Sequence, residues 1–167
     1  NTFSVHNSLA RSHLAEWYMH ELFRMEDIIT PQYDFIRISL NGRDMGVYAF
    51  EQHFDNTLLE HNKRPIGPII RHTDDGYWEN VNEKFEPFYW TRSSQIELFN
   101  KENEGDPQFV RLYDQAHSML NDFIHGRKKM SEVFDMDKMA RFFALLETSH
   151  AIHAQLFTNI RFYLNPY

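Results

Sequence analysis

Hydrophobic positions recur at helical spacing in three segments of the chain. In residues 8–25 the apolar side chains follow one face of a helix, and Asn7 or Ser8 can cap its first turn. Residues 107–125 carry a clean apolar stripe, which predicts an amphipathic helix packed on a core. Residues 136–155 are apolar nearly all round, so we expect a buried helix there.

A β-hairpin is predicted where the pattern changes to a period of two. Apolar and polar side chains alternate through residues 35–40, and Asn41-Gly42 follows. Asn and Gly tolerate the positive φ angles that a two-residue hairpin turn requires. The return strand, residues 45–51, has apolar side chains on both of its faces, so we expect it to be covered on both sides.

The rest of the chain predicts shorter elements. We expect a short helix over 55–62, a strand over 67–72 and a last strand over 159–165. Residues around 73–106 mix acidic, aromatic, Gly and Pro residues without a period, which predicts an irregular insertion. Gly126 is placed to end the helix before it. Together these elements predict an α+β fold.

Charge and composition exclude several classes of function. The formal net charge is −7, with 24 acidic and 17 basic residues, which argues against a partner that is a nucleic acid. The chain has no cysteine, so disulfides, zinc–thiolate sites and cysteine nucleophiles are excluded. No apolar run approaches the roughly 20 residues that span a bilayer, so we expect no membrane insertion by this segment.

Histidines at helical spacing raise the question of a metal site. Glu147, His150 and His153 follow one another at three-residue intervals, and Glu147 with His150 repeats the Glu-x-x-His spacing of carboxylate-bridged metal bundles. Such bundles need a second copy of the motif, and the sequence holds none. A structural role, in which the histidines hydrogen-bond to the backbone within a core, is the better interpretation.

Two charged residues on predicted strands are candidates for a site. Glu51 ends the return strand of the hairpin, where it is either a buried hydrogen-bond acceptor or part of a cleft wall. Arg71, near the end of the strand at 67–72, could bind a phosphate through two nitrogens or pair with a surface carboxylate. The residues alone leave both alternatives open.

Several motifs together resemble the CotH family, the spore-coat protein H-like group of kinase-like proteins. An arginine opens a helix at Arg11, and the string Leu-Asn-Gly-x-x-x-Gly-x-Tyr-x-x-Glu runs from Leu40 to Glu51. A Gly-Pro-Ile-Ile strand follows at 67–70, and the resemblance resumes at 135–147 and at 158–166 in sequences close to bacterial members. The stretch 73–134 carries no resemblance.

The resemblance implies an atypical protein-kinase-like fold that uses ATP with Mg²⁺ or Mn²⁺ to phosphorylate serine on protein substrates. Carried onto this chain, it implies that Asn159 is a metal ligand and lines the ATP site with Glu51 and Arg71. It also implies a secreted, cell-surface or spore-coat location. The predicted organisation is one domain over 1–167, the central part of a CotH kinase-like domain.

The chain departs from the family pattern at two places. The family carries an aspartate a few residues before the asparagine, but no Asp lies between Asp137 and Asn159, and His153 occupies that place as the candidate catalytic residue. The metal-binding aspartate of the family follows the last strand, and the sequence runs from Asn1 to Tyr167. We therefore expect a domain that is incomplete at both ends and inactive by itself. The alternative function is a non-catalytic coat or cell-surface protein that uses the same fold to bind a partner.

Overall fold

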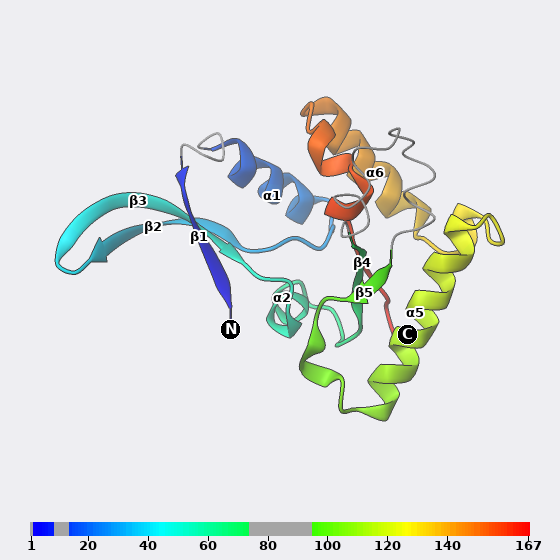
Figure 1. The fold of residues 1–167 in the computed structure, drawn as a ribbon. Coiled ribbons are helices and arrows are strands. Elements are labelled where there is room, and N and C mark those ends of the chain that lie inside the picture. The colour runs from blue at the N-terminus through cyan, green and yellow to red at the C-terminus, as the bar shows by residue number, and fades with distance from the viewer. Residues whose placement is uncertain (1, 9–13, 74–94) are drawn as a thin grey trace, which may run out of the picture. The chain divides into compact units, whose positions relative to one another are not determined.

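The computed structural model describes residues 2–8, 14–73 and 95–167. Two compact units divide the chain, Asn1–Arg64 and Pro65–Tyr167. Each unit contains its own three-stranded antiparallel sheet together with helices (Figure 1). The predicted α+β fold class is therefore confirmed.

The first unit is built on the predicted hairpin. Strands β2 (Tyr33–Leu40) and β3 (Arg43–Gln52) pair antiparallel, and β1 (Phe3–Asn7) pairs with the other edge of β3. At the turn, Asn41 and Gly42 have φ angles of 53° and 78°, the left-handed conformations that this residue pair was expected to adopt. The hairpin prediction is confirmed down to its turn residues.

The expectation that the return strand is covered on both faces is wrong for half of its length. Ala49, near the base of the hairpin, is completely buried, and Tyr33 at the start of β2 is only 3% exposed. Toward the turn, Met45 and Val47 are exposed. Cover stops because α1 (Ala15–Met25) packs against the base of β2, where His20 stacks on Tyr33 at 5.1 Å between ring centroids. The apolar pattern records hydrophobicity but not how far a covering element reaches.

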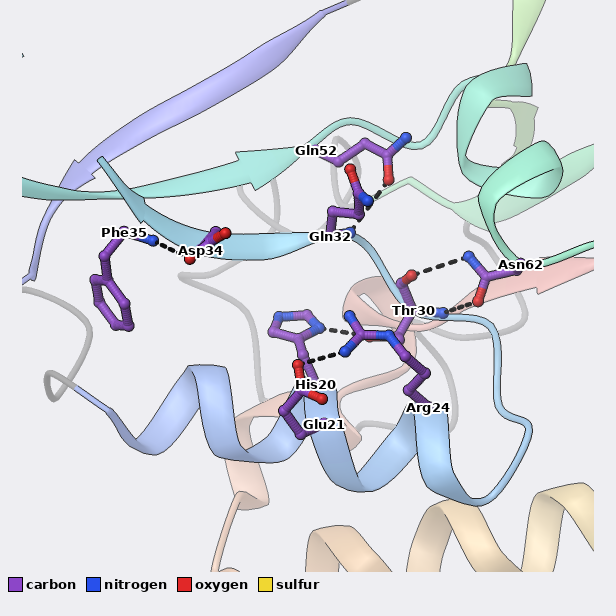
Figure 2. A network of polar contacts seen from close by, with 9 residues as sticks. All are labelled: His20, Glu21, Arg24, Thr30, Gln32, Asp34, Phe35, Gln52 and Asn62. Atoms are coloured by element: carbon purple, nitrogen blue, oxygen red, sulfur yellow. Dashed lines mark hydrogen bonds and ion pairs between the residues drawn. The ribbon is translucent and has the colours of Figure 1, made fainter. Parts of the chain in front are cut away.

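A polar network joins the helices of this unit to the base of the hairpin (Figure 2). Asn62 follows α2 (Asn56–His61) and holds Thr30 on both sides. Its Oδ1 accepts from the Thr30 backbone nitrogen at 3.1 Å, and its Nδ2 donates to the Thr30 carbonyl at 3.0 Å. The Thr30 hydroxyl contacts His20 of α1. These bonds satisfy buried backbone groups that an irregular segment would otherwise leave unpaired.

Alongside Thr30, Gln32 exchanges two hydrogen bonds with Gln52, the last residue of β3. The Gln32 backbone nitrogen donates to the Gln52 side chain at 3.1 Å, and the Gln52 backbone nitrogen donates to the Gln32 carbonyl at 2.9 Å (Figure 2). Both bonds fix the segment that enters β2. They also hold the end of β3, where Glu51 lies.

The second unit contains a sheet in the order β5-β4-β6. Its central strand β4 (Ile69–His72) pairs with β5 (Ile96–Leu98) and with β6 (Arg161–Tyr163). Strand β5 lies inside the segment expected to be irregular. The strand was not predicted because the alternation of three residues is too short to establish a period. Residues 74–94 of the expected insertion lie outside the described residues.

Helix α5 (Pro107–Ile124) packs on this sheet and confirms the predicted amphipathic helix. Asp106 caps it by accepting from the Gln108 nitrogen at 2.8 Å, and Gly126, with φ of 71°, follows its end as expected. Short 3₁₀ turns flank it, η2 (Lys101–Asn103) before and η3 (Met130–Glu132) after. The buried cluster between helix and sheet consists of Ile70, Leu98, Phe109, Ala116 and Leu120.

Helix α6 (Met136–Thr148) is shorter and less buried than predicted. Leu146 is its one buried residue, so the expectation of a buried helix is wrong. The helix ends early because the Thr148 and Ser149 hydroxyls donate back to carbonyls of the last turn, and His150 then adopts a φ of 54°. Two 3₁₀ turns, η4 (Ile152–Gln155) and η5 (Phe157–Asn159), take the place of the predicted continuation.

Candidate functional site

One face of the second sheet carries a row of charged side chains. Arg71 on β4 lies directly opposite Glu97 on β5 and directly opposite Arg161 on β6. Residues opposite one another in an antiparallel sheet point to the same face. The neighbouring row, with Ile70 at its centre, belongs to the core under α5. The charged row therefore lies on the face that is turned away from that core.

Arg71 is held by two contacts that leave part of its guanidinium available. Its Nε forms an ion pair with Glu97, and its Cζ lies 5.1 Å from the centroid of the Phe99 ring. The side chain is 29% exposed. Among the residues that the structure describes, its two terminal nitrogens have no hydrogen-bond partner. A guanidinium fixed through Nε presents those nitrogens as a fork, which suits an oxyanion.

Asn159 is brought to the same sheet by Arg161. The Arg161 Nη1 donates to the Asn159 backbone carbonyl at 2.6 Å. The Cζ of Arg161 lies 5.2 Å from the centroid of the same Phe99 ring that contacts Arg71. Asn159 ends η5 and is exposed to solvent. The structure thus places Arg71 and Asn159, two of the predicted site residues, on neighbouring parts of one unit.

Glu51 belongs to the first unit, near the end of β3. Its Oε2 lies 3.2 Å from Nε2 of His6 on β1. His6 is two residues from Ser4, the register partner of Glu51. Both side chains are partly buried, at 21% and 29% exposure. The hydrogen-bond acceptor role considered for Glu51 is therefore present. Its place beside Arg71 and Asn159 in a nucleotide site stays a prediction.

Sequence comparison supplies the family. The family model described as CotH kinase protein matches residues 7–165. The chain belongs to the CotH kinase family. The match spans both compact units and includes Glu51, Arg71 and Asn159. No curated protein sequence matches the chain closely enough to count as a relative.

Membership in the CotH family confirms the resemblance inferred from the motifs, including the part of it carried by residues 40–51. The match also runs through 73–134, where the motifs showed no resemblance. Residues 73–134 are therefore part of the region that the family model describes. Its strand β5 pairs with β4 and supplies Glu97 to the charged row.

Of the residues considered for a metal site in this CotH chain, Glu147 and His150 have described side chains, and these two are not gathered with other described ligands. Glu147 is exposed and accepts from the Gln155 Nε2 at 3.3 Å, and His150 is exposed after the end of α6. The backbone of His153 lies in η4, and its side chain is outside the described part, so its predicted catalytic role stays a prediction. Within residues 2–8, 14–73 and 95–167, no group of three or more His, Asp or Glu side chains could hold a metal ion.

Sequence reasoning missed Glu97, Phe99 and Arg161 of the candidate site. Each lies in a strand or at its end, and the alternation in Ile96-Glu97-Leu98 and in Arg161-Phe162-Tyr163 is the local signal that could have marked the polar face. That signal does not say which strands pair. The row exists only because β5 and β6 flank the same central strand.

No helix in the described part of the chain is both long and apolar enough to cross a bilayer.

Proposed function

We propose that this CotH-family protein is an ATP- and metal-dependent protein kinase that phosphorylates serine. The observation that carries the proposal is the family match over 7–165, combined with the neighbouring positions of Arg71 and Asn159 in the second unit. Phosphoryl transfer depends mainly on positioning and on neutralising the charge that develops on the phosphate oxygens. The guanidinium of Arg71 could neutralise phosphate charge, and the exposed Asn159 could help to position a metal ion.

Arg71 is the proposed phosphate-binding residue. Its Nε contact with Glu97 orients the guanidinium, and its terminal nitrogens would donate to phosphate oxygens. Its side chain is partly buried, which strengthens a charge-assisted hydrogen bond relative to one in bulk water. Glu51 is proposed to line the nucleotide site, and His153 is proposed to act near the reacting hydroxyl.

Asn159 fits a metal ion in part. Its amide oxygen is the type of ligand that Mg²⁺ and Mn²⁺ accept, and the residue is exposed. Mg²⁺ commonly takes one or two carboxylates together with the phosphates of its nucleotide. Near Asn159 the described residues offer no carboxylate cluster, so the remaining ligands would be phosphate oxygens and water. When bound, the ion would neutralise phosphate charge.

A second function, binding without catalysis, is favoured by a specific observation. The guanidinium of Arg71 is already ion-paired with Glu97, and no aspartate precedes Asn159 closely enough to take the family's catalytic place. A CotH-type domain that kept its fold and lost its base would serve as a coat or cell-surface protein whose partner is another protein. ATP binding separates the two functions.

The deciding experiment is a thermal-shift titration of the full-length protein with ATP in the presence of Mg²⁺ or Mn²⁺. We expect ATP with metal to raise Tm, because a ligand that binds only the folded state stabilises it. Asn159→Ala should abolish most of the metal-dependent part of that rise. Asn165→Ala, an exposed asparagine whose Oδ1 accepts from the Tyr167 nitrogen at 3.3 Å, is the matched control and should respond like the unmodified protein.

Absence of any ATP-dependent shift in the folded protein would reject the kinase and leave the binding function. A shift that is identical with and without divalent cation would reject Asn159 as a metal ligand. Transfer of ³²P from ATP to serine of a protein substrate then tests the chemistry itself.

A further inference from the structure

The turn of the hairpin in the first unit places two reactive groups on neighbouring residues. Asn41 and Gly42 are both exposed, and they connect β2 to β3 with φ angles of 53° and 78°. Within the described part of the chain, neither the Asn41 side-chain amide nor the Gly42 backbone nitrogen makes a hydrogen bond. An amide carbon and a backbone nitrogen that can attack it are therefore both available.

Few atoms surround this turn. A Cβ built on Gly42 would meet no heavy atom within 4 Å. Leu40, which pairs with Arg43 to close the turn, is 60% exposed. The strands next to the turn are joined by the ion pair of Arg37 with Asp44, whose side chains are 76% and 52% exposed. Because an ion pair this exposed contributes little to stability, the turn can open locally while the buried base of the hairpin stays folded.

We propose that Asn41-Gly42 is a site of spontaneous chemical modification, at which Asn41 deamidates through a cyclic imide. The Gly42 nitrogen attacks the Asn41 Cγ and forms a new N–Cγ bond. The bond from Cγ to the side-chain nitrogen breaks, and ammonia leaves with the proton that the Gly42 nitrogen gives up. Water then opens the imide at either carbonyl. The product is aspartate, or isoaspartate in which the main chain runs through Cγ.

Glycine distinguishes Asn41 from the other asparagines of the chain. It has no Cβ to hinder the attack, and its backbone rotates freely into the reactive conformation. Asn159 is also exposed, but the β-branched residue after it restricts the approach. Asn165 is exposed and precedes a proline, which has no N–H to react. The sequence contains Asn-Gly at this position alone.

The two products have different effects on the hairpin. Aspartate tolerates the left-handed conformation, so Asp-Gly keeps the pairing of Leu40 with Arg43. Isoaspartate adds a methylene group to the main chain, so a two-residue turn no longer fits the twist and register of its strands. Isoaspartate therefore opens the end of the hairpin at which the motif string Leu40–Glu51 begins. This inference goes beyond the proposed kinase function and does not depend on it.

Peptide mapping of the unmodified full-length protein, after prolonged incubation in mildly alkaline buffer, tests the site. Trypsin releases residues 38–43 as one peptide, whose aspartate and isoaspartate forms are separated by liquid chromatography and identified by mass spectrometry. We expect conversion at Asn41 to be about tenfold faster or more than at Asn159 and Asn165, because glycine leaves the attack unhindered. These two asparagines are internal controls, and a synthetic peptide of residues 38–43 verifies the conditions.

Conversion at Asn41 that is no faster than at Asn165, under conditions that convert the synthetic peptide, overturns the proposal. Since the unmodified protein is used, this outcome does not depend on the folding of a variant.

Limited digestion of the folded protein tests the effect on the hairpin. Incubated protein that has accumulated isoaspartate is compared with freshly purified Asn41→Asp, which carries the same charge on an ordinary main chain. We expect trypsin to cleave after Arg43 about threefold faster or more in the isoaspartate form, because an opened loop fits a protease better than a paired strand. Equal cleavage rates in the two proteins overturn the proposed opening of the hairpin.

Discussion

His72 is a fully buried histidine at the end of β4, in register with Ile96 on β5. Burial, together with a smaller contribution from the charge on His117 of α5, lowers the pKa of its imidazole to about 3. An unfolded histidine titrates near 6.5. Between pH 3 and pH 6.5, His72 is therefore protonated in the unfolded chain but neutral in the folded chain. Stability contributed by neutral His72 is therefore complete above about pH 6.5 and is lost as the pH falls toward 3.

We expect the free energy of unfolding to fall by about 2 kcal/mol between pH 7.5 and pH 5 on account of His72 alone. His72→Gln, which cannot take up a proton, should remove that part of the pH dependence. Urea unfolding of both proteins at each pH measures it. His125→Gln is the control, because His125 is exposed at the end of α5 and its loss should leave the pH profile unchanged. Equal pH slopes for the unmodified protein and His72→Gln would contradict the assignment.

At the scale of elements, the approach of β4 to β6 depends on Gly67. A Cβ at this position would overlap the carbonyl oxygen of Leu164 and lie 3.0 Å from the Tyr163 ring. The buried Asn100 side chain fixes the same place, because its Nδ2 donates to the Gly67 carbonyl at 3.0 Å and its Oδ1 accepts from the Ile69 nitrogen at 2.7 Å. The strand that presents Arg161 is therefore positioned by a glycine contact rather than by the charged row.

Gly67→Ala should destabilise the protein by about 2 kcal/mol, because the backbone of β6 has to move away from the added methyl group. Gly105→Ala provides the comparison, since no heavy atom lies within 4 Å of a Cβ built there. It should be neutral or slightly stabilising. Chemical denaturation of the two variants measures both effects, and equal stabilities would contradict the close approach of the strands.

At the scale of the whole molecule, net charge governs which large ligands can approach. With a formal charge of −7, the protein repels polyanions over distances of about a Debye length. A nucleic-acid duplex is bound through many cations along its backbone, whereas acidic residues outnumber basic ones in this chain.

We therefore expect no measurable binding of a labelled DNA duplex at physiological salt, in an anisotropy titration on the folded protein. Electrostatic binding that appears only at very low salt would agree with the charge argument. Saturable binding at physiological salt would contradict it.

Much of the fold and the residues of a candidate site could be predicted from the sequence. The Asn41-Gly42 hairpin and α5 with its Gly126 end were predicted because each depends on local chemistry, namely turn residues and helical periodicity. Family membership was likewise readable from a string of motifs. The resemblance implied site roles for Arg71 and Asn159, which stay predictions, and local patterning left Arg71 undecided between a phosphate and a carboxylate. The structure gives it the carboxylate of Glu97 and leaves its fork available.

The tertiary structure alone decided what flanks β4. Residues 96–98 carry too few side chains to show a period, so their pairing with β4, and with it the position of Glu97, was not readable. Arg161 became a neighbour of Arg71 because β6 returns from the end of the chain to the other edge of the same strand. Strand order depends on contacts between residues far apart in sequence, whereas periodicity reports only which face of an element is apolar. For the same reason the apolar patterns of α6 and of the hairpin overstated their burial.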